Sequence, residues 1–175
     1  MDKIDVIKME NREEILQIAY DLAFKYEAER GSCPQCVYSA LMETLDIGNK
    51  KTVKDIDALA GGTALSAEGT CGALVGGLCA ISSIVGRTYE DFNAGERKRR
   101  VFMYSKKLYD KFMEEYDSIL CKDVHKKLFG RSFNLMDKND YAEFEKMGAH
   151  VDKCPDVSGK TARWAAEIIL DSLKK

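Results

Sequence analysis

Apolar residues recur every three or four positions along most of the chain, which is the spacing of one face of an α-helix. The segment 12–29 shows this pattern clearly, with Ile15, Ala19, Leu22 and Tyr26 on one face and charged residues elsewhere. No run of five or more residues alternates between apolar and polar in the way that a half-buried strand does. The sequence therefore predicts an all-α fold.

Turn and cap residues divide the pattern into separate helices. Ser32 is a candidate N-cap, and Pro34 fits the first turn because a proline there loses no hydrogen bond. Glycines follow several segments and end them. The predicted helices cover residues 12–29, 33–45, 52–60, 71–85, 89–116 (a stretch that Gly95 could interrupt), 121–129, 138–147 and 161–173. Neither a repeat nor a linker divides residues 1–175, so we expect a single domain. This domain should be a bundle of about six to eight helices around the glycine-rich helix 71–85, which should be central and buried.

Composition limits the classes of function. The chain has 175 residues, of which 45% are hydrophobic and 32% charged, as in ordinary globular proteins. Its 27 Lys and Arg against 29 Asp and Glu give a net charge of −2, which argues against a nucleic-acid partner. The N-terminus has no secretory pattern, and the apolar run 71–85 is shorter than the roughly 20 residues that span a bilayer. We therefore expect a cytoplasmic protein without a membrane partner.

Cysteine is the unusual residue type in this composition. In a reducing cytoplasm, several cysteines in one domain favour metal binding or redox chemistry over a disulfide framework. For any single cysteine, the alternative is an inert, buried side chain. The six cysteines are Cys33, Cys36, Cys71, Cys79, Cys121 and Cys154.

The CPQC motif of residues 33–36 lies at the start of a predicted helix. The positive end of a helix stabilises a thiolate, which is both the nucleophile and the metal ligand. The spacing suits a cluster ligand, a zinc ligand or a redox pair. A thioredoxin-like fold would need a strand before the motif, but a helix precedes it here. A thiol–disulfide oxidoreductase or a sulfur- or metal-handling protein that uses Cys33 and Cys36 as a redox pair remains an alternative.

The stretch 68–77, EGTCGALVGG, surrounds Cys71 with glycines. Thr70 could cap the helix that begins there. Gly72 and Gly76 lie one helical turn apart, so they form a small face that a cluster or another helix could approach closely. The structural alternative is a tightly packed core helix.

Both histidines lie four residues from a cysteine. Cys121 with His125 and His150 with Cys154 have this spacing, so together they could form a structural zinc site. Cys154 is also followed by Pro155, as at the end of bacterial ferredoxin motifs. The sequence contains no CxxCH motif, so no haem is expected.

The second separated cysteine lies in Cys71-Gly72-Ala73-Leu74-Val75-Gly76, and this pattern resembles the family of putative redox-active proteins named C_GCAxxG_C_C. The resemblance covers about residues 30–173, and residues 12–29 would form an N-terminal helix packed on that region. The cysteines that match the family pattern are Cys33, Cys71, Cys121 and Cys154. Cys36 takes the place of a small residue, and Cys79 is also additional, so each is either a further ligand or a core residue.

This family is similar to the helical domain of split-Soret cytochromes c, whose cysteines are thought to hold an iron–sulfur centre. The resemblance implies a [2Fe–2S] or [4Fe–4S] cluster bound by the four matching cysteines, with Gly72 and Gly76 beside it, for electron transfer or redox sensing. Zinc is the alternative metal. The residues identify neither an electron-transfer partner nor a catalytic acid or base, so enzymatic activity stays open.

A broad apolar stripe on the helix 89–116 bears on assembly. It is wider than one packing contact needs, and the related split-Soret proteins look dimeric, so we expect an isologous homodimer. The C-terminal helix around Trp164 could cover the stripe instead. The stripe consists of Leu108, Tyr109, Phe112, Met113 and Tyr116.

Overall fold

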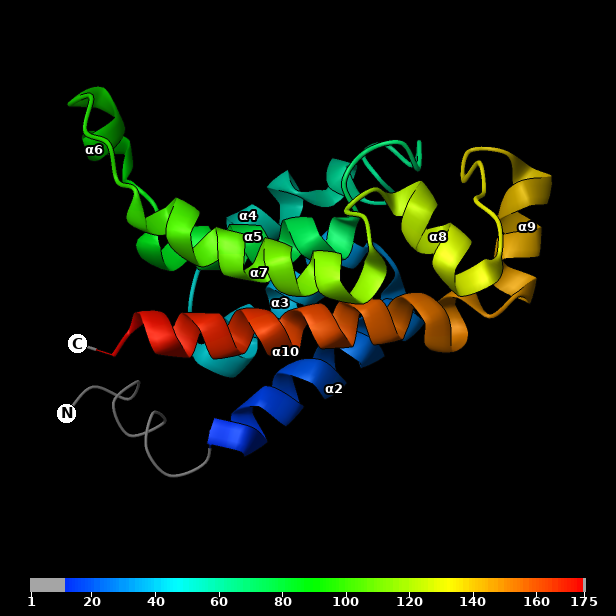
Figure 1. Ribbon diagram of the computed structural model, residues 1–175, viewed down its shortest axis with the longest axis horizontal. Helices are drawn as coiled ribbons and strands as arrows, with labels where there is room; N and C mark the ends of the chain where they lie inside the picture. Colours follow the sequence, from blue (N-terminus) through cyan, green and yellow to red (C-terminus); the bar gives the residue numbers. More distant parts are fainter. Residues whose placement is uncertain (1–11, 175) are drawn as a thin grey trace.

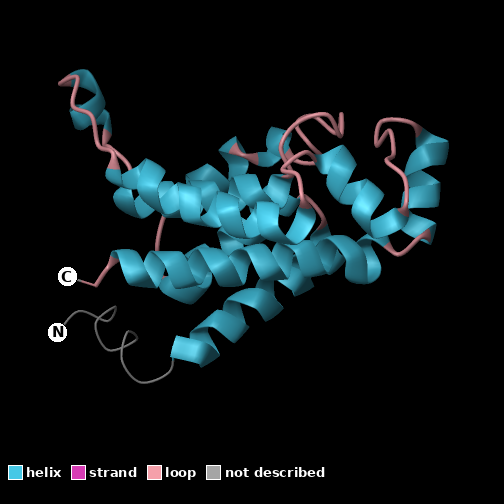
Figure 2. Cartoon of the chain, in the orientation of Figure 1, coloured by secondary structure: helices cyan, strands magenta, loops and turns pink. Residues whose placement is uncertain are grey.

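A computed structural model describes residues 12–174 of the chain. It confirms the all-α prediction, because the described residues form helices and, apart from one isolated bridge, no β-structure (Figure 1 and Figure 2). The elements are α2 (Arg12–Arg30), α3 (Cys33–Leu45), α4 (Lys50–Asp55), the 3₁₀ turn η1 (Asp57–Leu59), α5 (Gly72–Val85), α6 (Tyr89–Asn93), α7 (Arg100–Tyr116), α8 (Cys121–Phe129), α9 (Lys138–Lys146), the π-helical turn η2 (Ala149–Lys153) and α10 (Cys154–Ser172).

Two of the predicted helices are each divided in two. The segment 52–60 becomes α4 and η1. Helix α4 begins earlier than expected because the Asn49 side chain accepts hydrogen bonds from the Lys51 and Thr52 N–H groups. The stretch 89–116 becomes α6 and α7, which confirms an interruption near Gly95, a residue with a φ of 70°. Ser32 precedes α3 as predicted, but its hydroxyl donates to Asp57 rather than capping the helix.

The last helix differs most from its predicted start. α10 begins at Cys154 rather than at Thr161, since Pro155 in its first turn has no hydrogen bond to lose. Gly159 therefore lies inside α10, where the ring of Tyr20 packs on it. A Cβ atom at position 159 would lie 2.8 Å from that ring.

The core surrounds α10, which packs along α2 and also contacts α3, α5 and α7 (Figure 1). Leu74, Leu108 and Ile169 from three of these helices are each at most 1% exposed. A smaller aromatic cluster lies under α8 and α9 and consists of Phe129, Phe133, Leu135, Phe144 and Ala149. No helix in residues 12–174 is both long and apolar enough to cross a bilayer.

The glycine-rich helix α5 is less enclosed than its composition predicts. It packs on α3, α7 and α10. However, Leu78 and Cys79 are only half-buried, and Ser82 and Ser83 are exposed. One face of α5 is thus open to the surface, because α4 and α6 do not cover it.

Candidate functional site

Four cysteines that are far apart in the sequence line one cavity. The cavity has a volume of about 320 Å³, and Cys33, Cys71, Cys121 and Cys154 all contribute to its wall. Among the apolar wall residues, Ala73, Val124 and Val157 belong to the main core, and Leu135 and Phe144 belong to the smaller aromatic cluster. The polar residues of the wall include Glu27, Arg30, Ser32, His125, Tyr141, His150 and Ser158.

Each of these cysteines stands at the beginning of a helix. Cys33, Cys121 and Cys154 are the first residues of α3, α8 and α10, and Cys71 is the N-cap of α5. Cys71, and not Thr70, therefore occupies the cap position. A helix N-terminus carries unpaired N–H groups and partial positive charge. The positive ends of four helices thus meet at a cavity lined by sulfur, which suits a negatively charged group.

Burial raises the pKa values of the cavity thiols, whereas hydrogen bonds from backbone N–H groups lower them. The N–H groups of Ala73 and Leu74 lower the pKa of Cys71, but burial outweighs them and raises it to about 11. Burial also raises the pKa of Cys33, which the Gly61 N–H opposes only in part. Burial raises the thiol pKa values of Cys121 and Cys154 as well. The thiols therefore stay protonated unless positive charge enters the cavity.

The small face of α5 receives the start of α3. A Cβ atom on Gly72 would lie 2.5 Å from the Cys33 sulfur and 2.7 Å from the Pro34 ring. A Cβ atom on Gly76 would lie 2.5 Å from the Pro34 carbonyl oxygen. Neither glycine lines the cavity. Their contribution is close packing, which holds Cys33 next to the start of α5.

A left-handed turn lies against the cavity and was not anticipated from the sequence. Residues 61–65 all have positive φ, between 50° and 70°. A Cβ atom on Gly62 would lie 2.7 Å from the Cys121 Cβ, so only glycine fits there. For Thr63, Ala64 and Leu65, this conformation costs roughly 1–2 kcal/mol each. Backbone strain of this kind concentrates at functional sites.

Backbone hydrogen bonds join the segment before α5 to the segment before α8. Cys71 N–H donates to the Ile119 carbonyl at 2.7 Å, and Cys121 N–H donates to the Gly69 carbonyl at 3.0 Å. Lys122 N–H donates to a further carbonyl of the same loop at 2.8 Å. These bonds hold the starts of α5 and α8 side by side.

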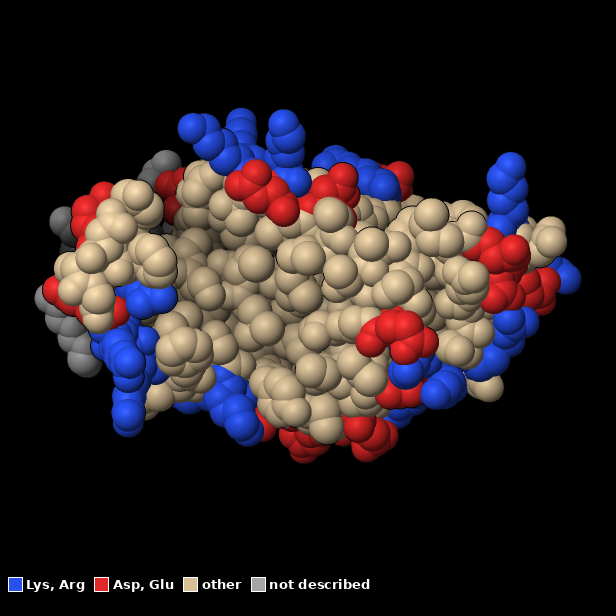
Figure 3. Space-filling view, turned by 90° about the horizontal axis from the view of Figure 1, so that it is seen from above, with Lys and Arg blue, Asp and Glu red and all other residues tan. Residues whose placement is uncertain are grey.

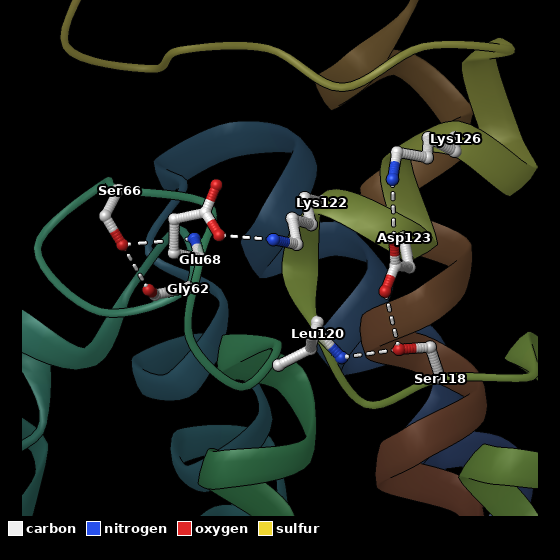
Figure 4. A network of polar contacts seen from close by, with 8 residues as sticks. All are labelled: Gly62, Ser66, Glu68, Ser118, Leu120, Lys122, Asp123 and Lys126. Carbon is white, nitrogen blue, oxygen red and sulfur yellow. Dashed lines mark hydrogen bonds and ion pairs between the residues drawn. The ribbon is translucent and has the colours of Figure 1, made fainter.

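Side chains reinforce this junction, as Figure 4 shows. Ser66 donates to the Gly62 carbonyl at 2.7 Å and accepts from the Glu68 N–H at 3.2 Å. Glu68 in turn forms an ion pair with Lys122 at the start of α8. At the other side of α8, Ser118 donates to Asp123 at 3.0 Å. The network fixes the loop around Cys121 on both sides.

A buried carboxyl group faces the thiols. Glu27 of α2 is 2% exposed, and burial raises its pKa while the charge of His150 opposes that rise. His150 Nε2 lies 3.7 Å from one Glu27 oxygen, and Ser158 donates to the other at 3.4 Å. His150 Nδ1 pairs with Glu145. Glu27 was not recognisable as a site residue before the fold was known, because it stands among charged residues of an amphipathic helix.

The two histidines reach the same cavity as the cysteines. His125 Nε2 lies 3.4 Å from the Cys121 sulfur, and His150 also lines the cavity. Burial lowers the pKa of His125 to about 4 and raises that of Cys121, so the pair is neutral and not a thiolate–imidazolium pair. Within residues 12–174, no group of three or more His, Cys, Asp or Glu side chains is placed to hold a single metal ion.

Cys36 and Cys79 do not line the cavity. The Cys36 thiol is buried and donates to the Gly31 carbonyl at 2.8 Å. Cys79 instead lines a surface groove with Val75 and Leu78. All six cysteines are free thiols.

The fold and the cavity define a helical protein whose site is built from cysteines at helix N-termini. The chain belongs to the family described as putative redox-active protein (C_GCAxxG_C_C), whose family model matches residues 31–168. The match contains all four cavity cysteines and leaves out Glu27, which precedes it. No curated protein and no solved structure matches the chain.

Proposed function

We propose that this redox-active protein holds a [2Fe–2S] or [4Fe–4S] cluster through Cys33, Cys71, Cys121 and Cys154, for electron transfer or redox sensing. The observation that carries the proposal is the meeting of these four thiols, each at a helix start, on one cavity. A bound cluster would supply one-electron chemistry there. A reducing compartment such as the cytoplasm would keep the cysteines available as thiols.

The donor set and its surroundings fit such a group. Four thiolates are the usual ligands of both cluster types. A cavity of about 320 Å³ has room for metal and sulfide atoms between the sulfurs. The N–H groups of Gly61, Ala73 and Leu74 act on two of these sulfurs. Donors of this kind stabilise the negative charge of a cluster and raise its reduction potential.

The raised thiol pKa values favour metal binding over dithiol catalysis. A catalytic thiol needs a lowered pKa, because the thiolate is the nucleophile. Burial raises the pKa values of both Cys33 and Cys36, and only Cys33 lines the cavity. Metal ions would compensate the buried negative charge and release the thiol protons on binding. Zinc bound by the same thiols is the alternative that metal analysis distinguishes.

Metal analysis of an anaerobically prepared chain, combined with a Cys36→Ser variant, tests this proposal. We expect iron and acid-labile sulfide in stoichiometric amounts and a brown chromophore that air bleaches. The metal content should be unchanged in Cys36→Ser, because Cys36 does not line the cavity. Zinc without sulfide would favour the structural zinc module. A colourless, metal-free protein with a Cys33–Cys36 disulfide would favour the oxidoreductase.

We further propose a homodimer, but with a different contact from the predicted stripe. Leu108, Phe112 and Tyr116 of that stripe are buried within the chain, against α5 and α10. One group of large exposed apolar side chains instead lies on α6 and the start of α7, where α6 projects from the helical body (Figure 1), and a second group lies around α9 and η2. Tyr89 and Phe102 are 72% and 73% exposed. Between this end and α9, the centre of the face in Figure 3 is free of charged side chains.

Light scattering of a Phe102→Lys variant tests the assembly. We expect the unaltered chain to have about twice the monomer mass of 19.7 kDa, and the variant to be monomeric because a charge disrupts an apolar interface. Met136→Lys is the matched control, since Met136 is 70% exposed at the other end of the molecule. A monomeric unaltered chain at micromolar concentration would contradict the proposed dimer.

A further inference from the structure

His125 is buried beside Cys121, and ligation of a cluster by four cysteines does not explain why a histidine is placed there. It lies one turn after Cys121 on α8 and is 2% exposed. Three phenylalanine rings surround it, with the ring centroid of Phe144 at 4.9 Å and those of Phe129 and Phe133 each at 5.8 Å. A histidine placed among aromatic rings for packing alone would be replaceable by another aromatic residue.

The two ring nitrogens of His125 have different surroundings. Nε2 lies 3.4 Å from the Cys121 sulfur. Nδ1 is buried and has no hydrogen-bond partner among the described residues. A neutral imidazole carries one N–H, and a buried N–H without an acceptor is rare and costly. The proton therefore belongs on Nε2, where the sulfur accepts it.

We propose that His125 donates an Nε2–H hydrogen bond to the Cys121 sulfur and thereby tunes the reduction potential of the group bound in the cavity. The effect on the reduction potential rests on the proposed cluster. The tautomer of His125 does not depend on a bound cluster. Among the described residues, His125 is the side-chain donor placed on a cavity thiol, whereas Cys33 and Cys71 face backbone N–H groups. Its donor can thus be removed without altering the backbone.

The imidazole donor makes a specific contribution to redox chemistry. A metal-bound thiolate has no proton of its own and can only accept a hydrogen bond. Reduction adds negative charge to the sulfur ligands, so the N–H···S bond stabilises the reduced form more than the oxidised form. Loss of the donor should therefore shift the potential to more negative values. His125 is in this sense a positioning and tuning residue rather than a ligand.

NMR of the full-length chain with ¹⁵N-labelled histidine tests the tautomer in metal-free protein. The chain has only two histidines, so a His150→Gln variant assigns both sets of signals. At neutral pH we expect His125 to carry its proton on Nε2, with an Nε2 chemical shift that changes in Cys121→Ala. A proton on Nδ1, an imidazolium, or an Nε2 shift that does not respond to Cys121→Ala would overturn the inference.

Redox titration of His125→Phe and His125→Gln tests the consequence. Phenylalanine fits the surrounding rings but removes the donor, whereas glutamine retains an N–H group. We expect a full cluster content with a more negative potential in His125→Phe and a partial return in His125→Gln. An unchanged potential in His125→Phe would show a packing role only. Absence of iron and sulfide from the unaltered chain would instead defeat the proposed function, and the NMR result would still decide the tautomer.

Discussion

A Cys71→Ser variant is expected to lose its iron–sulfur cluster completely while keeping its fold. Cys71 is the N-cap of α5, and serine is among the best residues for that position, so the helix should form normally. The hydroxyl is a poor ligand for iron, and even removal of an outer partner costs about 10–100-fold in metal affinity. Iron and sulfide per chain after anaerobic reconstitution, together with the visible spectrum, measure the loss.

Cys79→Ser is the matched control, because it makes the same atomic change on the same helix. Cys79 lines the surface groove and not the cavity. We expect its iron and sulfide content to equal that of the unaltered chain, with the same circular dichroism for both variants. A Cys71→Ser protein that binds the cluster normally, or equal losses in both variants, would refute ligation by Cys71.

A Gly76→Ala variant is expected to be destabilised by about 1–3 kcal/mol, the usual cost of overpacking. In an ordinary helix interior the same change stabilises by up to about 1 kcal/mol, so the sign of the effect is diagnostic. The new Cβ would lie 2.5 Å from the Pro34 carbonyl oxygen and 3.0 Å from the Val37 Cβ. Because a backbone carbonyl cannot rotate aside, α3 must move away from α5 and carry Cys33 with it.

Urea denaturation measures the free energy of unfolding of this variant, and metal analysis measures the effect on the site. We expect a lower cluster content as well as lower stability, since Cys33 directly precedes the displaced Pro34. Ser82→Ala on the exposed face of α5 is the control and should change stability by less than about 0.5 kcal/mol. Equal stability of Gly76→Ala and the unaltered chain would contradict the close contact between α3 and α5.

Local sequence patterns determined most of the helices. The apolar spacing of residues 12–29 and the glycine after residue 129 predicted α2 and α8 closely, because periodicity and capping depend on neighbours in the chain. The same local patterns misplaced the start of α10 at Thr161. Ser158 and Gly159 are typical of helix starts, but the ring of Tyr20 packs on Gly159 in the helix interior.

The candidate cysteines were also recognisable from the sequence, but only as a family pattern. Spacing along the chain does not reveal whether Cys33 and Cys121 share a site. Contacts between helices decide that, and they depend on the side chains of both partners at once. The small residues Gly72 and Gly76, for example, gain their role only when Pro34 packs against them.

The sequence by itself thus determined the all-α class, the helix faces and the cysteine pattern, since these follow from neighbouring residues. The tertiary structure alone decided that four helix starts meet at one cavity, that Cys79 lies outside it, and that Glu27 and His125 line it. It also decided that three of the five stripe residues on α7 are buried within the chain itself. The physical reason is that burial and charge at a site are properties of segments brought together by packing, which no local pattern contains.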